Sequence, residues 1–132
     1  MKTYENKSSF FIIQLEGETE RIKEETDITM DLILSAMNVG NIFYKFRQKA
    51  TKQLYYCFQT EKRKRRGQLI KLAEKLLPEE QRYDVIRLTK NKFYQTVNDM
   101  KQSFNFIKLE DPIDESNQYT GKDIKIFDNK KI

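Results

Sequence analysis

Apolar residues recur at helical spacing in several parts of the chain, and the first clear case is residues 27–37. Thr26 or Asp27 can cap this predicted helix, and acidic residues lie in its first turn. Asn38, Val39 and Gly40 then predict its end, because glycine readily adopts the left-handed conformation that follows a helix. The apolar face would consist of Ile28, Leu32, Ile33, Ala36 and Met37.

Upstream, residues 10–15 form an apolar run that fits either a short strand or a helix capped by Ser8 or Ser9. Gly17 weakens the helix by ~1 kcal/mol relative to alanine. We nevertheless favour the helix.

A longer helix is predicted over residues 42–66, with Asn41 as its cap and Gly67 as its end. At 1.5 Å per residue it would be roughly 37 Å long. One apolar face, within about 80° of arc, would carry Phe43, Phe46, Ala50, Leu54 and Cys57. Almost opposite, within about 60°, would lie Lys45, Lys49, Lys52, Tyr56 and Arg63.

The second half of the chain carries two further apolar patterns. Residues 69–77 predict a short helix, or the continuation of the preceding one, and Pro78 ends it. A heptad-like stripe follows, broken only at Thr89 and Lys90, where a kink or a new helix start is expected. It consists of Ile86, Phe93, Val97, Met100, Phe104 and Ile107. This stripe suits packing inside a helical bundle, and it also suits pairing with a helix of a protein partner.

These patterns together predict an all-α fold, a small bundle of four or five helices. Residues 1–109 would form the helical domain, with the basic helix at its centre. Residues 110–132 contain few apolar residues, and their first half is acidic, so they predict a flexible polar tail.

Composition is consistent with one soluble domain. The chain has 132 residues, of which 38% are apolar, enough for a core at this size. No apolar run approaches the ~20 residues that cross a bilayer, so we expect no membrane insertion. No secretory signal is visible and Cys57 is the single cysteine, which predicts a cytoplasmic protein, or a nuclear one if the source is eukaryotic.

Charge changes the picture most. Residues 41–66 hold nine basic residues and one acid, whereas the chain as a whole has a formal net charge of only +5. A concentrated positive field binds anions, and nucleic acid is the commonest such partner. The predicted nucleic-acid-binding residues are Lys45, Lys49, Lys52, Tyr56, Lys62, Arg63, Lys64, Arg65 and Arg66.

Other interpretations of the same charges stay open. The lysine face can be merely solvated, or paired with the acidic stretch of residues 16–31. Another anionic partner, such as an acidic protein or a membrane surface, would also be attracted. The run of residues 62–66 resembles a nuclear import signal as well as a phosphate-binding loop, and whether it is helix or loop is open.

The residue types present argue against catalysis. The chain contains no histidine, so Cys57 lacks a base that would activate it as a nucleophile, and no thiolate or imidazole metal site can form. Glu79, Glu80 and Asp84 are candidate carboxylates for a metal, but acids in a helix's first turn explain them equally well. No glycine-rich phosphate loop occurs. We therefore expect no enzyme activity, metal or cofactor.

The predicted function is non-catalytic binding of nucleic acid through phosphates. RNA or a single strand is favoured over duplex DNA, because tyrosine and phenylalanine residues interleave with the charges and can stack on unpaired bases. The alternative is a protein-interaction adaptor or inhibitor that docks on an acidic or nucleic-acid-binding partner. A phage or mobile-element origin would fit its small size and charge.

Overall fold

A five-stranded antiparallel sheet is the centre of the computed structural model, which describes residues 8–16 and 20–110. The strands are β1 (Phe10–Leu15), β2 (Val39–Gln48), β3 (Leu54–Thr60), β4 (Tyr83–Leu88) and β5 (Phe106–Glu110). The helices are α1 (Glu20–Ala36), α2 (Arg66–Leu76) and α3 (Lys90–Gln102). The predicted all-α bundle is therefore wrong, and the fold is mixed α/β.

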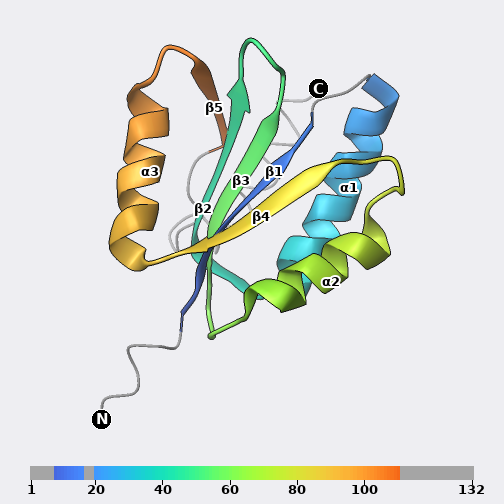
Figure 1. Cartoon of the computed structure of the whole chain (residues 1–132), viewed down its shortest axis with the longest axis horizontal. Helices are drawn as coiled ribbons and strands as arrows, with labels where there is room; N and C mark the ends of the chain where they lie inside the picture. Colours follow the sequence, from blue (N-terminus) through green and yellow to red (C-terminus); the bar gives the residue numbers. More distant parts are fainter. Residues whose placement is uncertain (1–7, 17–19, 111–132) are drawn as a thin grey trace, which may run out of the picture.

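The strand order is β4-β1-β3-β2-β5, and every neighbouring pair is antiparallel. The first four strands with α1 and α2 follow the chain order βαββαβ, the split arrangement seen in ferredoxin-like folds. Then α3 and β5 complete the domain, with β5 added at the free edge of β2. Helices α1 and α2 cover one face of the sheet and α3 covers the other (Figure 1).

Both faces of the central strands are buried, which explains the continuous apolar run at residues 10–15. Phe11 and Ile13 pack toward α1 and α2, whereas Phe10 and Ile12 pack toward α3. A strand covered on both faces needs no polar positions, so its sequence shows no alternation and is hard to distinguish from a short helix. The preference for a helix here was wrong.

The predicted basic helix over residues 42–66 is a β-hairpin followed by a loop. Within β2, Phe43 packs toward α1 and α2, whereas Tyr44 and Phe46 pack toward α3. Residues 49–53 form the turn, where the Lys52 amide donates to the Gln48 carbonyl oxygen at 2.8 Å. The apolar residues thus alternate between two cores and do not share one helical face.

The predicted stripe from Ile86 to Ile107 is likewise divided among three elements. Only its middle part is helical, where Phe93, Val97 and Met100 on α3 are buried against the sheet. Ile86 lies on β4, Phe104 in the turn after α3 and Ile107 on β5. Phe93, Val97 and Met100 are covered by the sheet, so the stripe is not one helical face that a partner helix could contact as predicted.

Two other predicted helices are confirmed in position. Residues 27–37 correspond to the second half of α1, and residues 69–77 fall almost wholly within α2, which begins three residues earlier. The first, however, begins at Glu20 and not at a cap at Thr26 or Asp27, and Ile28 and Leu32 of its predicted apolar face are 65% and 57% exposed. The predicted tail of residues 110–132 lies outside the described residues except for Glu110, the last residue of β5. None of the three described helices is long and apolar enough to span a membrane.

Candidate nucleic-acid interface

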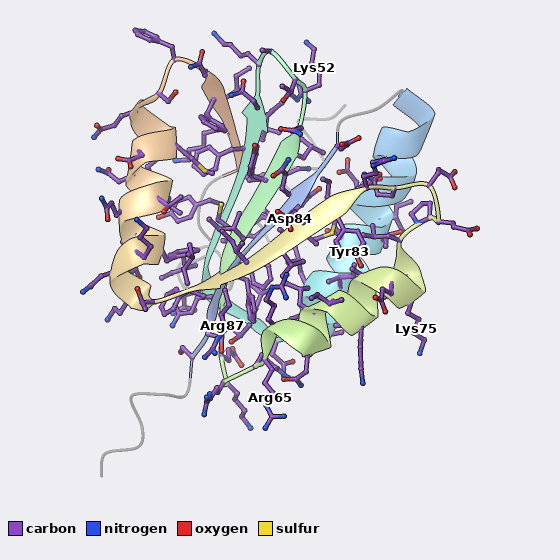
Figure 2. All side chains as sticks on the ribbon, in the orientation of Figure 1. Lys52, Arg65, Lys75, Tyr83, Asp84 and Arg87 are labelled. Atoms are coloured by element: carbon purple, nitrogen blue, oxygen red, sulfur yellow. The ribbon has the colours of Figure 1, made fainter. Side chains whose placement is uncertain are left out.

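The predicted binding residues occupy three separate places. Lys45 and Tyr56 lie in the middle of the sheet, under α1. Lys49 and Lys52 lie at the β2–β3 turn, and residues 62–66 lie at the opposite end of the sheet. Figure 2 shows Lys52 at the upper end of the molecule, and Arg65 with Arg87 at the lower end.

Lys45 is paired inside the protein. Its ammonium group lies 3.2 Å from the Asp27 carboxylate and 5.1 Å from the centre of the Tyr56 ring. The Tyr56 hydroxyl donates to the same Asp27 oxygen at 3.1 Å, and only 3% of Tyr56 is exposed. Burial, and then the charge of Asp27, raise the pKa of the Tyr56 hydroxyl far above its ordinary value. These two side chains stabilise the packing of α1 on the sheet.

A groove beside α1 has the wrong charge for phosphate. This groove of about 720 Å³ runs between α1 and strands β2 and β5. Four carboxylates line it, from Asp27, Asp31, Glu61 and Glu110, against a single lysine, Lys45. A surface of this charge repels a polyanion.

Residues 62–65 form a loop that is held beside the start of β1, and Arg66 begins α2. The hydroxyl oxygen of Ser9 accepts from the Lys64 amide at 2.8 Å and donates to the Lys64 carbonyl oxygen at 2.8 Å. Ser9 is 1% exposed, and its own amide donates to Thr60 Oγ1 at 3.0 Å. The basic loop therefore has a fixed backbone, which lowers the entropy lost when its side chains bind a ligand.

Three arginines converge beside this loop. Arg65, Arg66 and Arg87 line a concavity of about 420 Å³ together with Leu88 and Thr89. Arg66 Nε donates to the Val85 carbonyl oxygen at 2.8 Å, which joins the start of α2 to β4. Arg65 and Arg87 are exposed, and no described carboxylate forms an ion pair with either of them.

Two helices also begin at this place, and neither has an acid in its first turn. A helix N-terminus carries partial positive charge and favours a nearby anion. α2 begins with Arg66, whereas α3 follows its cap Thr89 with Lys90 and Lys92. We name residues 62–66 with Arg87, Lys90 and Lys92 the arginine end.

Arg87, Lys90 and Lys92 are residues that sequence reasoning missed. More than twenty positions separate them from the basic run, and the strand order brings them beside it. One sequence feature near them could have indicated an anion site. Thr89 is a good helix cap, yet lysines follow it in the first turn, where acids are usual.

Cys57 and the acids near residue 80 are the candidate reactive groups of the sequence. Cys57 is fully buried, and burial raises the pKa of its thiol, so the reactive thiolate is disfavoured. Glu80 and Asp84 do not share a helix, because Glu80 lies in the turn before β4 and Asp84 lies on that strand. Among the described residues, no group of three or more potential ligands is placed to hold a metal.

No family model and no curated protein sequence matches the chain. Among solved structures, the fold resembles the JCV large T-antigen origin-binding domain with a TM-score of 0.56. The match covers 80% of this chain and 73% of that one, at 14% sequence identity. At this identity the likeness concerns the fold alone.

Proposed function

We propose that this protein binds nucleic acid without catalysis, through phosphate contacts at the arginine end. The observation that carries the proposal is the convergence of Arg65, Arg66 and Arg87 beside the start of two helices that lack acids. Arginine suits phosphate because its planar guanidinium group can form two parallel hydrogen bonds to one anion. Helix N-termini add amide donors and a favourable field.

The cations at the starts of α2 and α3 have no acid in the same helical turn to neutralise them, which supports an external anion as their partner. Like charges at a helix start are unfavourable, by roughly 0.3–1 kcal/mol each at an exposed site. The five consecutive basic residues 62–66, in the loop and the first position of α2, add further repulsion. A bound phosphate chain would relieve both costs, and such binding would depend strongly on salt.

The structural neighbour supports nucleic acid over other anions in one respect. Its name describes an origin-binding domain, a class of DNA-binding protein, built on a similar fold. The sequence argument for RNA or single strands relied on aromatic residues of the basic segment stacking on bases. That argument is weakened, because Tyr44, Tyr56 and Phe58 are buried in the core of the folded protein. A cytoplasmic or nuclear location stays a prediction.

The test compares two triple variants of equal charge change. R63E/R65E/R87E reverses the charge of three exposed arginines at the arginine end. It spares Arg66, whose side chain donates to the Val85 carbonyl oxygen, and Lys64, whose backbone is bonded to Ser9. K49E/K52E/K75E makes the same change at exposed lysines elsewhere. Fluorescence polarisation with a labelled 20-nucleotide strand should show a loss of roughly 100-fold for the first variant and a small change for the second.

Equal losses for both variants would overturn the proposal, because they would show that only net charge matters. A poly-glutamate chain that competes as well as an unlabelled oligonucleotide of equal charge would favour the adaptor that docks on an acidic partner. Circular dichroism of both variants checks that the fold is retained.

A further inference from the structure

A groove along α3 has a different character from the arginine end. It has a volume of about 410 Å³. Its lining combines two aromatic rings, two amide side chains and one cation, from Tyr44, Tyr94, Gln95, Val97, Asn98 and Lys101. The exposed Tyr94 ring together with the two amides suits a planar polar ligand better than it suits an isolated phosphate.

The aromatic side of the groove is firmly positioned. Tyr94 is 39% exposed, and its ring packs on Phe10 at 5.9 Å and on Phe93 at 5.6 Å between ring centres. Tyr44 is 9% exposed and lies with the Lys101 ammonium group 4.9 Å from its ring centre. Burial, and then the charge of the Tyr44 phenol, raise the pKa of the Tyr94 hydroxyl.

The polar side of the groove supplies hydrogen bonding. Gln95 and Asn98 are exposed on α3, and no described residue bonds their side-chain amides. Each amide offers both a donor and an acceptor, the combination that reads the edge of a nucleobase. Lys101, the penultimate residue of α3, adds a positive charge suited to a phosphate.

The groove begins close to the arginine end. Thr89 lines the arginine concavity and caps α3, while Tyr94 and Asn98 are five and nine residues further along the same helix. At 1.5 Å per residue, Asn98 is only roughly 14 Å from Thr89. A strand whose phosphates rest on Arg65 and Arg87 therefore has its next nucleotides within reach of the groove.

We infer that this groove binds an unstacked nucleobase of a single strand, with Tyr94 as the stacking surface and Asn98 as the contact to the base edge. The inference rests on the proposed function and specifies its ligand. Base pairing in a duplex would hide both the face and the edge that the groove contacts.

The test separates bases from phosphates. The wild-type protein should bind a ten-nucleotide thymidine strand roughly tenfold more tightly than an abasic strand of the same length, as expected for one stacked base. Y94L keeps apolar bulk against Phe10 and Phe93 but removes the ring, so it should bind the two strands equally. Y94F keeps the ring and should retain the preference. Thermal unfolding of Y94L checks that the α3 packing is preserved.

A spectroscopic experiment gives an independent readout. The chain contains no tryptophan, so Y94W introduces a single tryptophan, which can be excited selectively over the remaining tyrosines. The thymidine strand should quench its emission, whereas the abasic strand should not. Removal of the Asn98 amide in N98A should weaken thymidine binding several-fold and leave abasic binding unchanged.

Failure of this inference is distinguishable from failure of the proposed function. Equal wild-type affinity for thymidine and abasic strands, both lost in R63E/R65E/R87E, would overturn the groove and retain the phosphate site. Tighter binding of a duplex than of the thymidine strand would also overturn it. Thymidine binding that survives R63E/R65E/R87E while Y94L abolishes it would overturn the phosphate site alone.

Discussion

The two ends of the sheet both carry exposed cations, yet they differ in what surrounds them. At the arginine end, basic residues from a loop, a strand and a helix meet where α2 and α3 begin. At the hairpin end, Lys49 and Lys52 lie on a short turn that is joined to the residues after α3 by a hydrogen bond from the Lys49 amide to the Asn105 carbonyl oxygen, at 2.8 Å. There α3 ends, and a helix C-terminus already favours lysine.

This comparison teaches that a count of charges does not locate a binding surface. Lysines near a helix C-terminus stabilise the protein and need no ligand. Cations added to helix N-termini destabilise it until an anion arrives. The direction of the nearby helices therefore distinguishes two regions that look alike in the sequence.

The largest effect on stability should come from the residue that fixes the basic loop. S9A removes a buried hydroxyl that makes two hydrogen bonds to Lys64, which should cost roughly 1–3 kcal/mol. T51A also removes a hydroxyl with two hydrogen bonds, but at the exposed hairpin, and should cost well under ~0.5 kcal/mol. Urea unfolding measures both, and equal costs would show that the basic loop is not pinned as described.

The next effect concerns Lys45 and Tyr56, which belong to neither end. The pKa of Tyr56 is raised in the folded protein above its ordinary value of 10.0, so the unfolded chain loses this proton first as pH rises. Stability should therefore fall above about pH 10, by up to ~1.4 kcal/mol per pH unit from this residue. Buried Cys57 contributes in the same direction from about pH 9, its ordinary value being 9.0.

Y56F isolates the tyrosine contribution, because it removes the ionising hydroxyl and keeps the ring. Urea unfolding across pH 8 to 11 should show a shallower alkaline decline for Y56F than for the wild type. An identical decline in both proteins would contradict the burial of Tyr56 against Asp27.

A smaller effect on stability should have opposite signs when a lysine is replaced by glutamate at the start of α3 and at the end of α2. K92E places an acid in the first turn of α3 and completes a capping box with Thr89, so it should stabilise the fold by roughly 0.3–1 kcal/mol while weakening nucleic-acid binding. K75E places an acid in the last turn of α2 and should destabilise by a similar amount, with binding nearly unchanged. Thermal melts and polarisation on the same samples check both signs.

The smallest expected effect on stability concerns Lys52 in the β2–β3 turn. Lys52 has a φ of 66°, in the left-handed region that favours glycine. K52G should therefore raise the free energy of unfolding by up to ~1 kcal/mol and leave nucleic-acid affinity almost unchanged. A clear loss of affinity would mean that the hairpin end contributes to binding after all.

Part of this structure was predictable from sequence. Leu69 and Ala73 recur at helical spacing in a segment bounded by Gly67 and Pro78, and α2 forms there. The hairpin was not predictable in the same way, because Phe43 and Phe46 satisfy a helical sector as well as opposite faces of a strand. Strands buried on both faces lack the alternation that would have identified them.

The candidate site was predictable only where its residues are consecutive in the sequence. Residues 62–66 were identified as basic and stay together, whereas Arg87 joins them only because β4 lies at the sheet edge beside α2. Lys45 was predicted to face a ligand, but it is paired with Asp27. This pairing could not be predicted, because Asp27 lies eighteen residues earlier and reaches Lys45 only when α1 packs on the sheet.

The most direct test of the central claim is a backbone amide NMR titration of the intact protein with a short unlabelled oligonucleotide. We predict that the largest shift changes fall on residues 62–66, on Arg87 and on residues 89–92, and that residues 49–53 barely move. Changes concentrated at the hairpin turn, or spread evenly over all exposed lysines, would contradict the account.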